Sequence, residues 1–220
     1  MSSINNRPGF RAWYSCLKKL IQLGSIGVFG LRAFGLDRCA TEGSIIVASN
    51  HQSHLDPPLI GCTYPRRLSY MARDSLFRLK PMALLIESLG AFPLNRDSSV
   101  SGYKESLRRL KAGEAIMAFP EGTRTPDGEI HEFKGGIARM AQRSGATIQP
   151  AAIEGAFACW PRRCSLPRPG RVFIAYGEPL LPEEIGDMDE AALAAEVERR
   201  IRELHAELRA HPAFGKAVGP

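Results

Sequence analysis

Residues 44–60 read SIIVASNHQSHLDPPLI. The apolar and largely β-branched run from Ile45 to Ala48 predicts a short buried strand. Beyond the polar stretch that follows Ser49, Pro57 suits the first position of a helix and Asp56 suits its N-cap. This segment therefore predicts a strand, a loop and a helix in succession, which is the repeating unit of layered α/β folds.

Short β-branched runs alternate with stretches of helical period through the rest of the chain. The predicted strands are residues 45–48, 68–71, 116–119, 147–153 and 172–175. Apolar residues at helical spacing form three groups, which are Tyr103, Leu107 and Leu110, then Ile137, Met140 and Ala141 before Gly145, then Leu193, Val197, Ile201, Leu204 and Leu208. We therefore expect an α/β fold with a mostly parallel central sheet flanked by helices, and a surface loop over residues 160–170.

Length and composition indicate one globular catalytic domain. The chain has 220 residues, 44% of them hydrophobic and 24% charged, without the bias of a disordered, collagen-like or polytopic membrane protein. Its net charge of +6 suits nucleic acid, an anionic lipid surface or a phosphorylated substrate, or else reflects a solvated basic surface without a specific partner. Five cysteines without a C-x-x-C pair, and an N-terminus without secretory-signal features, favour a reduced cytoplasmic compartment.

The N-terminal region contains one membrane-like segment. Residues 20–31 carry no charge, and they follow an aromatic pair and a lysine pair, Trp13, Tyr14, Lys18 and Lys19. This segment is too short to span a bilayer, which takes about 20 helical residues, and its glycines weaken helix propensity. We expect residues 1–40 to form a helical segment that lies on the anionic cytoplasmic face of a membrane, with residues 41–220 as the catalytic domain. The alternative is that the segment packs on the domain core.

The loop after the first predicted strand holds a candidate base. If His51 lies in the turn and Asp56 at the helix start, the carboxylate can accept the Nδ1 proton of the imidazole, which leaves the other ring nitrogen to act as a base. Such a pair needs no protein nucleophile when the substrate supplies a hydroxyl group. The alternative is that Asp56 only caps the helix and that His51 and His54 are surface residues.

Three further segments follow in order along the chain. They read GAFPLNR at residues 90–96, FPEGTRT at residues 119–125 and IQPAAI at residues 148–153. Together with NHQSHLD, they resemble the four ordered blocks of the glycerolipid acyltransferases, typified by bacterial 1-acylglycerol-3-phosphate acyltransferases. Two positions differ from the family pattern: His54 stands where an aromatic residue is frequent, and Gln149 stands where valine or isoleucine usually precedes the proline.

The resemblance implies that His51 is the general base, that Asp56 orients it, and that the second and third blocks hold the glycerol phosphate of the acceptor. The implied substrate-binding residues are Arg96, Glu121, Gly122, Thr123 and Arg124. Arginines donate bidentately to phosphate, and a glycine lets backbone N–H groups approach an anion. Because a carboxylate repels phosphate, we assign Glu121 to the acceptor hydroxyls or to orienting an arginine. Lys134 is a further candidate cation, with plain surface charge as the alternative.

The expected function is transfer of a fatty acyl group from a thioester donor, acyl-CoA or acyl-carrier protein, to 1-acylglycerol-3-phosphate, which forms phosphatidate in phospholipid biosynthesis. Base catalysis on a thioester requires no cofactor and no metal ion, and we expect backbone N–H groups near the start of the Asp56 helix to stabilise the carbonyl oxygen. An anionic membrane surface is an expected partner and nucleic acid is not. The alternatives are another lysolipid acceptor, a metal-dependent hydrolase with His51, His54 and Asp56 as ligands, and a non-enzymatic lipid-binding module.

Overall fold

The described residues fold around one β-sheet. The computed structural model describes residues 8–94 and 99–215. Within these residues the sheet has seven strands, which from edge to edge are β1 (Arg32–Phe34), β7 (Phe173–Tyr176), β6 (Thr147–Glu154), β2 (Ile45–Ser49), β5 (Ala115–Ala118), β3 (Leu68–Arg73) and β4 (Ala91–Leu94). Neighbouring strands of this sheet are parallel except β6 and β7, which are antiparallel. The predicted class, an α/β fold with a mostly parallel sheet, is confirmed.

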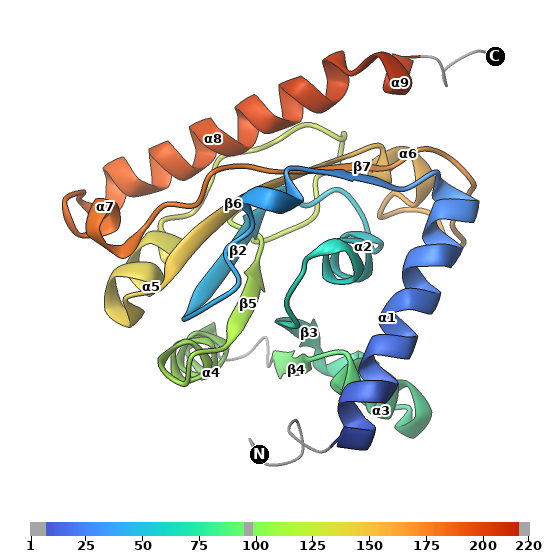
Figure 1. Ribbon diagram of the computed structural model, residues 1–220, viewed down its shortest axis with the longest axis horizontal. Coiled ribbons are helices and arrows are strands. Elements are labelled where there is room, and N and C mark those ends of the chain that lie inside the picture. The colour runs from blue at the N-terminus through green and yellow to red at the C-terminus, as the bar shows by residue number, and fades with distance from the viewer. Residues whose placement is uncertain (1–7, 95–98, 216–220) are drawn as a thin grey trace.

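Helices cover both faces of the sheet (Figure 1). They are α1 (Pro8–Phe29), α2 (Asp56–Thr63), α3 (Lys80–Ser88), α4 (Ser99–Lys111), α5 (Gly136–Ser144), α6 (Ala156–Cys159), α7 (Pro182–Gly186), α8 (Glu190–Ala210) and α9 (Pro212–Gly215), with short 3-10 helices at Leu36–Arg38 and Asp74–Phe77. Side chains of α4, α5, α7 and α8 form one apolar cluster with the sheet, and side chains of α1, α2 and α6 form the other.

Strand β2 lies in the middle of the sheet and is buried on both faces. Ile46 and Ala48 belong to the cluster with α4, α5 and α8, whereas Ile45 and Val47 belong to the cluster with α1 and α2. A parallel strand covered by helices on both faces is expected to be a continuous apolar run rather than an alternating one. The strand is therefore held from both sides, and the loop that follows it starts from a fixed point.

The sequence pattern found the central strands and missed the edges. The five predicted strands correspond to β2, β3, β5, β6 and β7, and the three predicted helical stripes lie on α4, α5 and α8. Strands β1 and β4 form the two edges of the sheet, and their sequences, RAF and AFPL, contain no β-branched residue. In β4, Pro93 lacks an N–H group, which is tolerated at a sheet edge. Residues 161–170 form no helix or strand and are largely exposed, as predicted for the surface loop.

The N-terminal segment is a continuous helix joined to the sheet. Helix α1 packs on α2, and Phe29 at its end is buried. Residues 32–34, which were predicted to belong to the N-terminal segment, form β1 and pair with β7. The sheet therefore begins before residue 41. In the part of the chain that the structure describes, no helix is both long enough and apolar enough to cross a membrane.

Two residues of the four blocks serve the sheet itself. Gly90 has a φ of +100°, and a Cβ atom there would lie 2.4 Å from the carbonyl oxygen of Leu68. Only glycine therefore lets β4 come this close to β3. Gln149 is fully buried, and its amide accepts from the Ala40 N–H (2.9 Å) and donates to the Gly177 carbonyl oxygen (2.6 Å). The unusual glutamine before the fourth-block proline thus connects β6 to the segments after β1 and β7.

Candidate active site

The loop with His51 leaves the sheet at the carboxyl end of β2. Asn50, directly after the strand, donates from Nδ2 to the carbonyl oxygen of Ile153 (2.9 Å) and accepts at Oδ1 from the N–H of the same residue (2.9 Å). Its side chain thus continues the β2–β6 pairing for one more step. Because ligands of α/β sheets bind beyond the carboxyl ends of the strands, His51 stands where such a site is expected.

His51 and Asp56 form the expected pair. His51 Nδ1 lies 2.7 Å from Asp56 Oδ2, and that same oxygen accepts from the N–H groups of Gln52 (2.6 Å) and Ser53 (2.7 Å). The Asp56 side chain is fully buried, whereas the His51 side chain is 17% exposed. Burial raises the pKa of the Asp56 carboxyl above its ordinary value, and the donors from His51, Ser53 and Gln52 limit that rise. The imidazole is therefore anchored on one side by a buried carboxylate.

Asp56 is not the N-cap that the sequence indicated. Helix α2 begins at Asp56 itself, and Leu55 occupies the N-cap position without a side-chain hydrogen bond. The carboxylate turns back to the loop before the helix, because three donors of that loop converge on its Oδ2 atom. As a consequence, the N–H groups of Gln52 and Ser53 are already engaged. The expectation that N–H groups at this helix start stabilise the carbonyl oxygen does not hold for these two.

The third block holds the backbone of His51 on both sides. Glu121 is 4% exposed, and its carboxylate accepts from the His51 N–H (2.7 Å) and the His131 N–H (3.2 Å). The Thr125 N–H donates to the His51 carbonyl oxygen (2.8 Å). Burial raises the pKa of the Glu121 carboxyl, and the hydrogen bonds from the His51 and His131 N–H groups oppose the rise. The expected contact of Glu121 with the acceptor stays a prediction, and its observed partners show that it holds the backbone at His51 and His131.

Phe119 supports the imidazole ring itself. The two rings are stacked, with centroids 3.9 Å apart and planes 12° from parallel. Since Phe119 directly follows β5 and His51 closely follows β2, this stacking results from the pairing of the two strands. His51 is thus fixed by its backbone, its Nδ1 atom and one face of its ring.

The remaining third-block residues form an open turn beside the base. Gly122 and Thr123 are exposed, Arg124 is half-buried, and Gly122 has a φ of +70°. A Cβ atom on Gly122 would lie 3.1 Å from Lys134 Nζ, so the ammonium group lies against this turn. The structure therefore brings Glu121, Gly122, Thr123 and Arg124 into one segment next to His51. Arg96 of the second block lies outside the described residues.

The candidate metal ligands do not come together. His54 is exposed and its ring lies against Trp160, with centroids 5.2 Å apart, whereas His51 contacts Asp56. Over residues 8–94 and 99–215, no three His, Cys, Asp or Glu side chains are grouped as ligands of one ion. The contact of His51 with Asp56 has the geometry expected of a base and its orienting carboxylate, and the catalytic role of the pair stays a prediction.

The sequence profile of the acyltransferase family matches residues 31–154, which is more than half of the chain and contains all four blocks. The chain belongs to the acyltransferase family. The resemblance inferred from the four blocks is thereby confirmed. In this acyltransferase the matched region runs from the start of β1 to the end of β6 and so includes the whole His51 site.

Individual relatives agree with this membership. The acyltransferase is 28% identical over 185 residues to 1-acyl-sn-glycerol-3-phosphate acyltransferase of Bacillus subtilis, which covers 81% of this chain and 90% of the relative. It is 32% identical over 117 residues to a lyso-ornithine lipid O-acyltransferase of Pseudomonas aeruginosa, which covers 52% of this chain and 44% of the relative. The crystal structure of the 1-acyl-sn-glycerophosphate acyltransferase PlsC of Thermotoga maritima superposes with a TM-score of 0.82 at 27% identity, over 92% of this chain and 82% of that one.

Sequence reasoning missed several residues of this acyltransferase that hold His51 and its loop in place. Phe119 and the backbone partners of Glu121 were not singled out, and neither was the buried side chain of Gln52. Ala48 pairs with Ala118, so the residues just beyond β2 and β5 are neighbours. The signal for Phe119 was therefore its position at the end of a predicted strand, residues 116–119, but this signal requires knowledge of which strands are adjacent.

Proposed function

We propose that this acyltransferase moves a fatty acyl group from a thioester donor to the free hydroxyl of 1-acylglycerol-3-phosphate, which yields phosphatidate in phospholipid biosynthesis. The observation that carries the proposal is the 2.7 Å contact of His51 Nδ1 with the buried Asp56 carboxylate, beside the open turn at Gly122. The names of the Bacillus subtilis and Thermotoga maritima relatives support the choice of acceptor.

The proposed chemistry uses His51 as a general base. His51 removes the proton of the acceptor hydroxyl while the oxygen attacks the thioester carbonyl, and Asp56 stabilises the imidazolium that forms. Collapse of the tetrahedral intermediate breaks the carbon–sulfur bond, and the thiolate then takes up the proton from His51. No acyl-enzyme forms. Because a thiolate is a good leaving group, the reaction needs neither a cofactor nor a metal ion.

The turn after Glu121 is the proposed phosphate site. Gly122 and Thr123 are exposed next to the base, and Lys134 Nζ lies against Gly122. Together with Arg124, and with Arg96 by the family resemblance, Lys134 supplies the cations that a phosphate monoester requires. The Gly122 N–H already donates to the Phe119 carbonyl oxygen (2.9 Å), so the proposed site relies on these cations rather than on that N–H group. The basic balance of the chain, +6, agrees with an anionic acceptor.

One screen tests both the reaction and the acceptor. Purified enzyme is given 1-acylglycerol-3-phosphate and other lysolipids, each with acyl-CoA and with acyl-carrier protein as donor, and the products are identified by mass spectrometry. Phosphatidate is the expected product, and the same reactions with the His51→Ala variant are the control. Acylation confined to a different lysolipid would refute the choice of acceptor, and the Pseudomonas aeruginosa relative makes that the second candidate.

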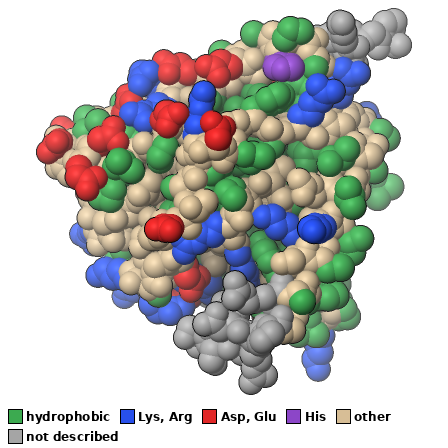
Figure 2. Space-filling model, in the orientation of Figure 1, with side chains coloured by type: hydrophobic (Ala, Val, Ile, Leu, Met, Phe, Trp, Pro, Cys, Tyr) green, Lys and Arg blue, Asp and Glu red, His purple; other side chains and the backbone are tan. Residues whose placement is uncertain are grey.

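We further propose that the enzyme is peripheral on the anionic cytoplasmic face of the cell membrane. Large apolar side chains are exposed along α1, namely Trp13, Leu20, Leu23, Ile26 and Val28. Leu79 and Leu84, before and within α3, are also exposed, and Trp13 donates to Ser88 Oγ at the end of α3 (3.4 Å), so the two helices are neighbours. In Figure 2, hydrophobic side chains follow the right-hand edge, where α1 lies in Figure 1, whereas acidic side chains gather at the upper left near α7 and α8. A helix with a row of exposed apolar side chains favours contact with a membrane interface.

A further inference from the structure

Gln52 lies between His51 and Asp56 in the sequence, and its side chain is buried rather than exposed at the open turn. It is 1% exposed, and its Nε2 atom donates to the Gly128 carbonyl oxygen (3.2 Å) and to Glu154 Oε2 (3.2 Å). Its Oε1 atom accepts from the Phe157 N–H (3.3 Å). The side-chain amide therefore holds the His51 loop against the loop at Gly128, the end of β6 and helix α6.

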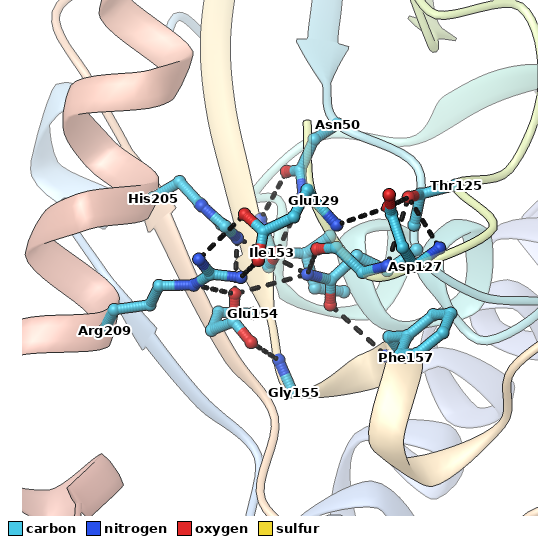
Figure 3. Close-up of polar contacts among 12 residues, drawn as sticks. Asn50, Thr125, Asp127, Glu129, Ile153, Glu154, Gly155, Phe157, His205 and Arg209 are labelled. Atoms are coloured by element: carbon cyan, nitrogen blue, oxygen red, sulfur yellow. Dashed lines mark hydrogen bonds and ion pairs between the residues drawn. The ribbon is translucent and has the colours of Figure 1, made fainter. Parts of the chain in front are cut away.

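Glu154 is the centre of this network and connects it to the C-terminal helix. Its Oε2 atom also accepts from His205 Nε2 and from Arg209 Nε (3.0 Å), and its Oε1 atom accepts from the Gly155 N–H (2.9 Å). His205 and Arg209 stand one turn apart on α8 and reach the end of β6 together (Figure 3). Burial raises the pKa of Glu154, but His205 and Arg209 outweigh burial and lower it below its ordinary value. Glu154 is thus a carboxylate that accepts from all four donors.

The main chain of Gln52 links this network to the catalytic pair. Its N–H donates to Asp56 Oδ2 at 2.6 Å, on the atom that also contacts His51 Nδ1. We propose that Gln52 is a positioning residue for the His51–Asp56 pair, and that Glu154, with His205 and Arg209 of α8, holds Gln52 in place. The C-terminal helix then sets the geometry of proton transfer. The inference rests on the assignment of His51 as the base.

The alternative is that the network only stabilises the packing of α8 and does not position His51. Loss of positioning and loss of packing change different measured quantities. A misplaced base lowers kcat, since small errors in the position of a reacting group slow the chemical step, whereas lost packing lowers the melting temperature and the amount of folded enzyme. We expect neither KM to depend on Gln52 directly, because its side chain is buried and its partners are protein groups.

The decisive variant is Gln52→Met. Methionine is similar in size to glutamine and keeps the backbone N–H, but it lacks the side-chain amide. We expect kcat per folded enzyme to fall about 10- to 100-fold with both KM values nearly unchanged. The acid limb of the kcat profile should also move to higher pH. The Gln52 N–H is one of the donors that lower the pKa of Asp56, so a weaker hydrogen bond raises that pKa and protonates the carboxylate at higher pH.

A matched pair of arginine variants separates positioning from helix docking. Arg209 donates to Glu129 through two nitrogens and to Glu154, while Arg139 donates to Glu190 through two nitrogens at the other end of α8. Both arginines are about half exposed and both attach α8 to the domain. We expect Arg209→Ala to lower kcat severalfold and Arg139→Ala to leave it unchanged, with similar shifts in melting temperature.

Specific results would overturn the proposal. It is wrong if Gln52→Met lowers the melting temperature but leaves kcat per folded enzyme within about twofold, or if both arginine variants lower kcat equally. If Gln52→Met does not fold, the arginine pair decides alone. A His51→Ala variant with full activity would instead refute the proposed function, whereas an inactive His51→Ala beside a fully active Gln52→Met refutes only the positioning function.

Discussion

The loop with His51 and the turn after Glu121 meet at one site but are built in opposite ways. In the loop, Asn50 and Asp56 are buried and each makes two or more hydrogen bonds. In the turn, Gly122 and Thr123 are exposed, and Lys134 lies beside them at the surface. The first region is fixed by the protein alone, and the second leaves polar groups facing solvent.

This difference matches the two tasks of a transferase. A general base works best when it is held in one geometry before the substrate arrives. A phosphate site must remain open, because its donors are satisfied by the ligand. Changes in the loop should therefore lower kcat, and changes in the turn should raise the KM of the acceptor.

The largest expected effect is that of His51→Ala. Loss of the general base should lower kcat about 10²- to 10⁴-fold, because proton removal from the acceptor hydroxyl is no longer assisted. The protein should stay folded, since the His51 side chain is partly exposed. Steady-state kinetics with circular dichroism as the folding check measures both.

His54→Ala is the matched control for this variant. His54 belongs to the same loop but is exposed and lies against Trp160 rather than Asp56. It should change kcat only slightly. Equal losses in the two variants would show that the loop, rather than the His51–Asp56 pair, is what activity requires.

The next largest effect is expected in the turn. Arg124→Ala should raise the acceptor KM about tenfold or more and leave the donor KM unchanged, because a charge-assisted phosphate contact is lost. Arg96→Ala should act in the same direction. Arg143→Ala, at the exposed end of α5, is the control for loss of one positive charge. A rise confined to the donor KM would mean that the second and third blocks bind the donor instead.

The fixed loop could be predicted largely from sequence, because its determinants are local. The apolar run of β2, the two prolines of α2 and the spacing from His51 to Asp56 all lie within residues 45–58. The error at the N-cap is one residue, and it arose because an aspartate before prolines usually caps a helix. Here the loop donors attract the carboxylate instead.

The supports of that loop could not be predicted, because they depend on strand order and on distant helices. Glu121 reaches the His51 N–H across the pairing of β2 with β5, and Gln52 reaches Glu154 next to a helix more than 130 residues further on. Neither neighbour is visible in a pattern of apolar spacing. The same applies to β1 and β4, whose edge positions are set by the rest of the sheet.

A smaller effect, on membrane binding rather than on chemistry, is expected for α1. Leu20 and Leu23 are 61% and 67% exposed, so the double variant Leu20→Ser and Leu23→Ser should keep its fold. Binding to anionic liposomes in a sedimentation assay should fall about tenfold, because two leucines no longer enter the interface. The kcat on a soluble acceptor should not change. Deletion of residues 1–40 is a poor test, since it removes β1 from the sheet.

Leu181→Ser is the control for this variant. Leu181 is also exposed but precedes α7, on the opposite face of the sheet from α1. It should bind liposomes like the unaltered protein. If the α1 variant also binds normally, or if the unaltered protein stays in the supernatant with anionic liposomes, the membrane proposal fails.

The smallest expected effect is that of chelation, which should leave kcat and both KM values unchanged. In the fixed loop, Asp56 Oδ2 already accepts three hydrogen bonds, and His51 Nδ1 is one of the donors, so neither atom is set up as a metal ligand. Proton removal by imidazole also requires no cation. The measurement is activity before and after dialysis against a strong chelator, with zinc added back. Loss of activity that zinc restores would mean that the loop binds a metal, and the contrast between a fixed base and an open phosphate site would no longer describe this enzyme.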